Sequence, residues 1–406
     1  MTGAGMSDAE HFICPGFRAA GCACGIKKNG DLDLALIVAD EPAAAAAVFT
    51  KNRVKAAPLL LAAERIGGDG GGRARAVLIN SGNANACTGT DGLSAARETT
   101  GAVSDIIGCP EELVLPASTG VIGAPLPVDP ILSSLDRLAG ALSPTGFVDA
   151  ARSIMTTDTF PKLSRRSAVV GDRAYTVLGI AKGAGMIRPD MATMLSFVLT
   201  DAPISRESLR RALGDAVRDT FNAVTVDGDT STNDMVLAMA GGLGGRGEPL
   251  SGTGMDVWYE EFHGVLAELS GMIVKDGEGA TKCVTITIMG GPDDDTARRA
   301  AFAVAESPLV KTAFFGGDPN WGRIMGAIGM VPGDFDPNRA DIAVNEVPVA
   351  KDGLGTGIEA EKAAARIMAG DEFSVTIDLK SGDGSFSVMT TDLSYDYVRI
   401  NADYRS

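Results

Sequence analysis

The stretch KGAGMIRPDMATMLSFVL, residues 182–199, decides how the middle of this 406-residue chain folds. A Gly-rich loop stiffened by Pro189 leads directly into the apolar run from Met194 to Leu199. A short apolar run of this kind fits a strand that is buried on both faces. Thr193 stands at the start of that strand, where the core behind it would hold its side chain in place. The stretch therefore predicts a loop-to-strand junction with a hydroxyl group at its tip.

Thr193 has two interpretations on these residues alone. As a β-branched residue it favours a strand, and this is the ordinary role of a threonine before an apolar run. If the Ala192–Thr193 bond is cleaved, however, Thr193 becomes a new N-terminus whose free α-amine lies beside its own hydroxyl. That pairing is one way to activate a weak hydroxyl nucleophile. The second interpretation predicts a self-processing enzyme.

The composition limits the partners of the chain and the origin of a catalytic base. A formal net charge of −16 argues against nucleic acid or an anionic membrane as the main partner, because both require clustered cations. The sequence has two histidines, His11 and His263, and neither lies in a Gly-rich turn. A Ser-His-Asp or Cys-His site is therefore poorly supported. A small metabolite is the expected ligand.

The six cysteines predict neither a disulfide framework nor a metal site. Their spacing fits reduced thiols, and Cys22-Ala-Cys24 with His11 lacks the usual ligand spacing of a zinc site. Residues 1–10 lack the basic start and apolar run of a signal peptide, and no apolar stretch approaches the roughly 18 residues that span a bilayer. We expect a cytoplasmic protein without a metal.

Strand-like and helix-like runs alternate along the chain, which predicts a mixed α/β protein. The expected strands are 31–38, 73–78, 113–115, 167–170, 175–180, 194–199 and 282–289. The expected helices are 90–107, 130–142, 147–155, 205–221, 255–272 and 296–306, with Ser205 and the acidic run 293–295 at two N-termini. The alternation in 373–379 and 386–388 around the turn 381–384 predicts a hairpin.

Three small-residue segments each follow an apolar run: Thr119-Gly120, the loop 182–192 and the turn 227–231. Glycine at such points lets backbone N–H groups approach a ligand closely. An acyl-transfer enzyme needs two donors aimed at the developing oxyanion, and Thr119-Gly120 is a candidate. Gly-rich turns are more often only turns. The loop 183–185 lacks the endings of phosphate-binding and dinucleotide-binding motifs.

Nine ordered segments, with the loop before Thr193 counted as one, are spread over nearly the whole chain. They are Gly16–Gly21, Asn80–Ala86, Pro116–Gly123, Met155–Thr159, Lys182–Ile187 with Met191–Leu195, Asp227–Asp234, Asp276–Lys282, Asp318–Arg323 and Asn401–Ser406. Together they resemble one known family, the glutamate N-acetyltransferases of arginine biosynthesis, also called the ornithine acetyltransferase or ArgJ family.

The resemblance implies a layered αββα fold of the aminopeptidase type, similar to N-terminal nucleophile hydrolases. It also implies self-cleavage between Ala192 and Thr193 into an α chain, residues 1–192, and a β chain, residues 193–406. The α chain would contain the oxyanion-hole and substrate loops. The β chain would begin with the nucleophile and end with a substrate-binding segment. Two copies of each chain would form an α2β2 unit.

The resemblance further implies an acetyl transfer from N2-acetylornithine to glutamate through an acetyl-Thr193 intermediate. The free α-amine, with an ordinary pKa of about 7.7 to 8.0, would serve as general base. Thr119 and Gly120 would stabilise the oxyanion, and the implied substrate contacts are Thr156, Lys182, Thr193, Glu278, Asn401 and Ser406. No cofactor is expected, and acetyl-CoA is a candidate second donor. The alternatives are a self-cleaving hydrolase, in which water takes the acyl group, and an uncut binding protein.

Overall fold

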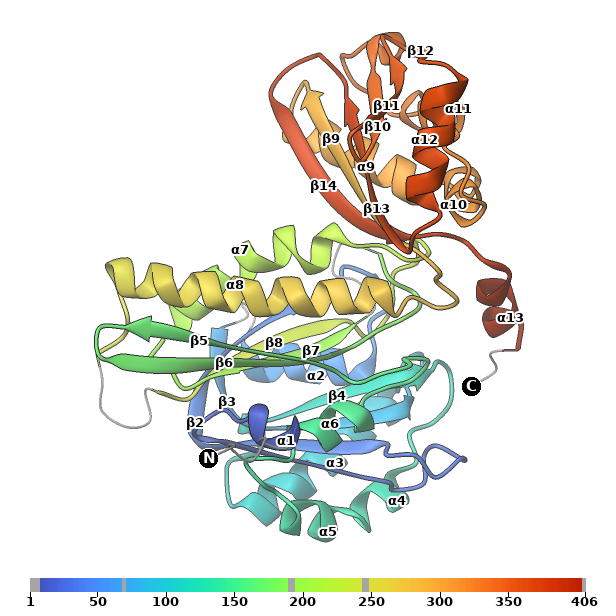
Figure 1. Cartoon of the computed structure of the whole chain (residues 1–406). Helices are drawn as coiled ribbons and strands as arrows, with labels where there is room; N and C mark the ends of the chain where they lie inside the picture. Colours follow the sequence, from blue (N-terminus) through green and yellow to red (C-terminus); the bar gives the residue numbers. More distant parts are fainter. Residues whose placement is uncertain (1–7, 68–70, 189–193, 243–247, 404–406) are drawn as a thin grey trace, which may run out of the picture.

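The computed structural model describes residues 8–67, 71–188, 194–242 and 248–403. Figure 1 shows two layered bodies that follow each other along the chain. The first contains strands β1 to β8, and the second contains strands β9 to β14. Helix α13 (Tyr395–Asp403) follows the second body and returns to the first, where Asn401 Nδ2 donates a hydrogen bond to Glu278.

The first body is built on one eight-stranded sheet with the order β4-β3-β2-β8-β7-β6-β5, and β1 pairs with β2. Strand β7 lies between β6, its antiparallel partner, and β8, its parallel partner. All six residues of β7 are buried, as the sequence predicts. The strands are β1 (Phe17–Cys22), β2 (Leu34–Phe49), β3 (Gly71–Asn83), β4 (Val114–Val121), β5 (Lys162–Val170), β6 (Arg173–Lys182), β7 (Leu195–Thr200) and β8 (Met235–Ala240).

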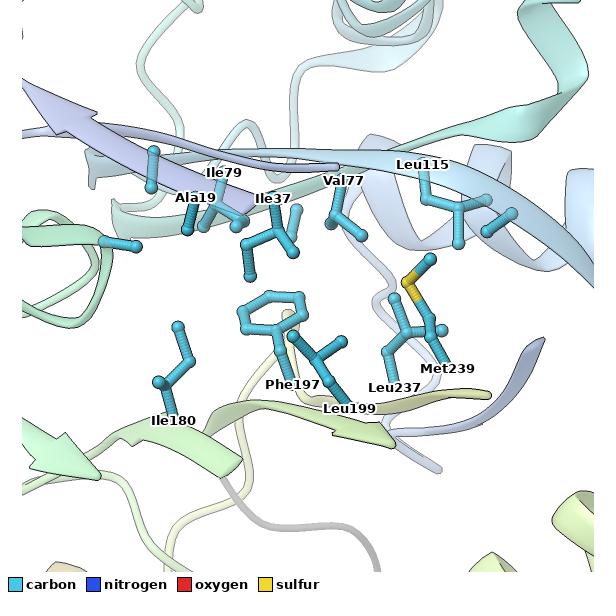
Figure 2. Packing of buried hydrophobic residues seen from close by; sticks show 14 of the residues in the cluster. Ala19, Ile37, Val77, Ile79, Leu115, Ile180, Phe197, Leu199, Leu237 and Met239 are labelled. Atoms are coloured by element: carbon cyan, nitrogen blue, oxygen red, sulfur yellow. The ribbon is translucent and has the colours of Figure 1, made fainter. Parts of the chain in front are cut away.

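Strand β2 turns this sheet into two layers. Its first part pairs with β1, its second part pairs with β8, and β3 pairs with both parts, with a register shift between Val38 and Ala43. The two halves of the sheet therefore face each other across one apolar core. Figure 2 shows Ile37 and Val77 from one half pointing toward Phe197 and Leu199 from the other.

Helices cover both outer faces of the folded sheet. Helix α8 packs on β5 and β6, and α7 packs mainly on β2, whereas α3, α4 and α5 pack on the other outer face, over β1 to β4. The predicted αββα layering is thus confirmed. The helices are α1 (Asp8–His11), α2 (Ala57–Ile66), α3 (Gly89–Ile107), α4 (Val128–Leu132), α5 (Leu135–Gly140), α6 (Phe147–Ser153), α7 (Arg206–Asp219) and α8 (Gly252–Lys275).

The second body has a six-stranded sheet with the order β12-β11-β10-β13-β9-β14 and its own apolar core. Its strands are β9 (Cys283–Gly291), β10 (Asp341–Val344), β11 (Val347–Lys351), β12 (Leu354–Gly355), β13 (Glu372–Asp378) and β14 (Gly384–Thr391). Its helices are α9 (Asp294–Ala305), α10 (Pro308–Phe315), α11 (Trp321–Ile328) and α12 (Ile358–Met368).

The hairpin predicted for 373–388 is wrong. Strand β13 pairs in parallel with β9, and β14 pairs antiparallel with the other edge of β9, so β9 lies between them. The connection crosses the glycine-rich end of β9, where Ser381 N donates to Gly290 O and a side chain on Gly382 would collide with Gly291 O at 2.5 Å. Alternation gave the buried face of each strand but could not identify its neighbour.

Two local predictions are confirmed and one is wrong. Ser205 and Asp293 cap α7 and α9, each accepting a hydrogen bond from the backbone N–H three residues on. The single helix expected at 130–142 is two short helices, α4 and α5. The hydroxyls of Ser133 and Ser134 bond to Pro130 O at the break, because serine side chains compete for backbone carbonyls.

In the described ranges, no helix combines the length and apolar character that a bilayer span requires.

Candidate active site

A cavity of about 120 Å³ brings together the predicted site residues that the structure describes. They come from five separate parts of the chain: the end of β4, the segment after α6, the end of β6, the loop after α8, and α13. The residues are Thr119, Gly120, Thr156, Lys182, Glu278 and Asn401. Their distance in sequence makes this convergence a property of the fold and not of any local motif.

Ala192, Thr193 and Ser406, which were also predicted for the site, lie outside the described residues. The residue that follows Thr193 is described. Met194 N donates to Asp234 Oδ1 at 2.9 Å, and the next residue, Leu195, pairs with Lys182 across β6 and β7. Because Lys182 and Asn233 both line the cavity, the start of β7 stands at its wall.

The proposed oxyanion residues lie within β4 and not in the turn that the sequence predicts. Strand β4 continues to Val121, and Gly120 pairs with Gly82 of β3 where the ladder changes register. Gly120 has a φ of +131°, and a Cβ there would lie 2.4 Å from the carbonyl carbon of Gly82. Only glycine fits a backbone this close and with this φ.

Lys182 connects the two threonines of the cavity. Its Nζ donates to Thr119 Oγ1 at 3.2 Å and to Thr156 Oγ1 at 2.8 Å. The side chain is buried, and burial lowers the pKa of Lys182 from its ordinary value, although Asp158 opposes that shift. An ammonium group has three N–H donors, and two of those of Lys182 go to the threonines. The third is suited to bind a substrate carboxylate.

A buried ionic cluster supports this lysine from behind. Lys162 Nζ contacts the carboxylates of Asp158 and Asp276, and all three side chains are almost fully buried. Asp158 also accepts hydrogen bonds from Gly183 N at 2.7 Å and from Thr156 N at 2.9 Å. Burial alone would raise the pKa of Asp158, but Lys182 and Lys162 outweigh it and lower that pKa to about 2. The cluster therefore fixes both loops that present Thr156 and Lys182.

The opposite side of the cavity is acidic. Glu278 is held by a hydrogen bond from its N–H to Ala184 O, and its Oε2 accepts from Asn401 Nδ2 at 2.9 Å. A side chain on Gly185 would lie 2.3 Å from the same carboxylate, so the Gly-rich loop leaves room for it. An ionised carboxylate in this position is suited to bind an ammonium group.

Sequence reasoning assigned no role to several polar residues that line the cavity, among them Asp227, Asp229, Asn233 and Tyr397. Asp227 and Asp229 belong to the small-residue turn 227–231 that the sequence singled out, and Asn233 follows it, but nothing in the composition showed that these side chains face the cavity. Tyr397 had no signal, because its helix α13 is placed only by the folded chain. No sequence pattern pointed to the buried Lys162 either.

The histidines and cysteines take no part in the cavity. His11 lies on α1 and His263 on α8, and Cys22 and Cys24 pack against the core beneath α3 to α5. Burial raises the pKa of the Cys24 thiol to about 12. Within the described ranges, no three His, Cys, Asp or Glu side chains gather as a metal site would require.

Comparison with known proteins identifies the family of the chain. The model of the ArgJ family matches residues 18–406. The arginine biosynthesis bifunctional protein ArgJ of Geobacter sulfurreducens is 51% identical over 397 residues, which cover 96% of this chain and 99% of that protein. The protein of the same name from Syntrophotalea carbinolica is 49% identical, with the same coverage of both chains.

The chain belongs to the ArgJ family. Membership makes it an acyltransferase of arginine biosynthesis, as the resemblance predicts. A solved member is the ornithine acetyltransferase of Mycobacterium tuberculosis complexed with ornithine. It is 40% identical over a match that covers 43% of this chain and 92% of that one, with a TM-score of 0.39.

Proposed function

We propose that the protein transfers the acetyl group of N2-acetylornithine to glutamate and that Thr193 carries the acetyl group between them. The observation that carries the proposal is the convergence of Thr119, Gly120 and Lys182 on one cavity at the start of β7. The printed names of the relatives, which include an ornithine acetyltransferase, support the choice of substrate.

Thr193 would first be released as an N-terminus. Its hydroxyl attacks the carbonyl carbon of Ala192, the peptide C–N bond breaks, and the acyl group moves to the hydroxyl oxygen as an ester. Water then hydrolyses this ester. The products are an α chain that ends at Ala192 and a β chain that begins at Thr193. The new α-amine has an ordinary pKa of about 7.7 to 8.0, close to that of an effective general base at neutral pH.

The transfer itself would proceed in two halves. The Thr193 hydroxyl loses its proton to the α-amine and attacks the acetyl carbonyl of N2-acetylornithine. The amide C–N bond breaks, and ornithine leaves with that proton. The α-amine group of glutamate then attacks the acetyl ester, the C–O bond breaks, and Thr193 recovers its hydroxyl. Each half passes through an oxyanion, for which Thr119 and Gly120 would be the donors.

The charges of the cavity support specific substrate contacts. Lys182 would bind the α-carboxylate, and Glu278 would bind the distal ammonium of ornithine. Thr156, Asn401 and Ser406 would add polar contacts. No metal or other cofactor takes part in these steps. The bifunctional name of the relatives makes acetyl-CoA a second donor to be tested, and we propose an α2β2 assembly in the cytoplasm.

The test compares the wild type with Thr193→Ala. Wild-type protein should give two bands on a denaturing gel, with a β chain that begins Thr-Met-Leu-Ser, and should form N-acetylglutamate from acetylornithine and glutamate. Thr193→Ala should remain one chain and be inactive. Release of acetate without N-acetylglutamate would favour a hydrolase. One uncut, inactive wild-type chain would favour a binding protein, and cleavage in Thr193→Ala would refute the self-processing step.

A further inference from the structure

Ornithine and glutamate, the two acetyl acceptors, carry opposite distal charges that would occupy nearly the same place in the cavity. On the proposed function, ornithine ends in an ammonium group after three methylenes, and glutamate ends in a carboxylate after two. If Lys182 binds the α-carboxylate of both, their distal groups reach the same acidic side of the cavity. A permanently ionised wall there would attract ornithine but repel glutamate, and like charges in a buried site are strongly unfavourable.

The acidic side contains more carboxylates than the ammonium of ornithine requires. Three of its lining residues are acidic, Glu278, Asp227 and Asp229, whereas Lys182 is the cation that lines the cavity among the described residues. Glu278 is the carboxylate that the proposed function assigns to the ornithine ammonium, and it accepts a hydrogen bond from Asn401. A group whose charge changes with the substrate is therefore sought among the two neighbouring aspartates.

Asp227 has the surroundings of a group that can hold a proton. Its Oδ2 accepts from Met186 N at 2.6 Å and from the hydroxyl of Tyr397 at 3.4 Å, and its Oδ1 accepts from Asp229 N at 3.2 Å. The backbone donors fix the carboxyl group at the cavity wall. Met186 N comes from the Gly-rich loop and Asp229 N from the turn of Asp227 itself, so the group stays in place whether or not it is charged.

Most of the charged groups around Asp227 disfavour its ionised form. Asp229 of the same loop and Glu278 after α8 are negative, whereas Lys311 of α10 is a cation that interacts with Asp227. Tyr397 of α13 is a neutral donor, and Glu306, near Gly228, is already paired with Arg188. Burial, with Asp229 and Glu278, raises the pKa of Asp227 to about 6 even though the two backbone donors oppose the shift.

We infer that Asp227 is the residue that lets one cavity accept both distal charges: it is ionised against the ammonium of ornithine and takes a proton from solvent when the carboxylate of glutamate enters. This inference rests on the proposed function. A protonated Asp227 donates its O–H to the glutamate carboxylate, and an ionised Asp227 accepts from the ornithine ammonium. Asp227 is thus a specificity residue in addition to Glu278.

The two acetylated compounds provide a clean test, because both donate to the same free enzyme when the reaction runs in either direction. With N-acetylornithine and N-acetylglutamate competing in one solution, the ratio of their kcat/KM values is measured from pH 5 to pH 8. Ionisations that affect both donors equally cancel in this ratio. Cleavage on a denaturing gel and the Tm are recorded for every variant.

In the wild type we expect the ratio to favour N-acetylornithine increasingly as the pH rises through about 6, because Asp227 loses its proton there. Asp227→Asn imitates the protonated carboxyl group and retains an acceptor for Met186 N–H. It should lower the ratio at pH 8 at least about 10-fold and make it independent of pH, since hydrogen bonds to charged groups contribute that much. Asp229→Asn, the matched control, should retain the pH dependence.

A wild-type ratio that does not change with pH overturns the inference, whether or not the Asp227→Asn variant folds. The inference is also overturned if Asp227→Asn lowers kcat/KM for both donors by the same factor, because that is the result of a purely structural role. If the wild type accepts an acetyl group from neither donor, the proposed function fails and this inference with it. If it accepts both and only the ratio stays constant, the inference fails alone.

Discussion

The two walls of the cavity are held in different ways. The wall formed by β4 and β6 is buried: Thr119 and Lys182 are at most 6% exposed, and the ionic cluster of Lys162 lies behind them. The wall formed by α13 is exposed. None of the helix is buried, and Tyr395 and Val398 are 80% and 61% exposed. It is tied to the body by single hydrogen bonds such as that from Asn401 to Glu278.

This difference separates two tasks. Oxyanion donors must be held within a fraction of an ångström of the reacting atoms, and only a packed core provides that precision. Some substrate contacts can be made by an element that moves, because substrates must enter the cavity and products must leave it. We therefore expect changes in the buried wall to affect stability and kcat, and changes in α13 to affect mainly KM.

The largest effect should follow from breaking the buried cluster. Lys162→Met leaves the carboxylates of Asp158 and Asp276 without their cation and should lower the free energy of unfolding by about 3 to 5 kcal/mol, as expected for an uncompensated buried charge. Urea denaturation measures the change. The control is Lys362→Met, whose ion pair with Glu359 is exposed, and it should cost less than about 1 kcal/mol. Equal effects of the two substitutions would remove the distinction between the walls.

The next effect concerns the rate. Thr119→Val keeps the shape of the side chain but removes the hydroxyl that Lys182 contacts, and it should lower kcat about 10²- to 10³-fold, or about 2.7 to 4 kcal/mol of barrier. Steady-state kinetics of acetyl transfer measures it, with KM for both substrates recorded. A change in KM alone would mean that Thr119 binds substrate in the ground state and does not stabilise the oxyanion.

Acid should weaken the buried wall in a defined range. The pKa of Asp158 in the folded protein, about 2, is below its ordinary value of 3.8, so its contribution to stability is complete above that ordinary value. The contribution is lost as the pH falls from about 4 toward 2 and is on the order of 2 kcal/mol. Urea denaturation from pH 5 to pH 3 measures it: the stability difference between wild type and Asp158→Asn should shrink. A difference that is constant with pH would contradict this account of Asp158.

The smallest effect should come from the exposed wall. Asn401→Leu removes one hydrogen bond to Glu278 and should raise KM for acetylornithine roughly fivefold, corresponding to about 1 kcal/mol, without a change in Tm. Arg399→Leu lies on the same helix, where Arg399 pairs only with Asp396 of α13 in the described contacts, and serves as the control. A fall in Tm for Asn401→Leu would show that α13 stabilises the body as the buried wall does.

The sequence predicted what local pattern controls. Strands β5, β6 and β7 and the caps of α7 and α9 are where apolar runs and capping residues place them. The pairing of β13 and β14 with β9 was missed, because a strand pattern shows its buried face and not its neighbours. The resemblance assigned roles to six of the described cavity residues. It assigned none to Asp227, or to Lys162 behind the cavity, because their roles depend on charges brought together by distant segments.

The most direct test asks whether Thr193 carries the acetyl group during the reaction. The purified protein is incubated with N2-acetylornithine in the absence of glutamate, and the peptide that begins at Thr193 is analysed by tandem mass spectrometry. We expect one acetyl group as an ester on the Thr193 hydroxyl, formed as ornithine is released and removed as N-acetylglutamate when glutamate is added. An acetyl group on a different residue, or transfer to glutamate without any acetylated Thr193, would contradict it.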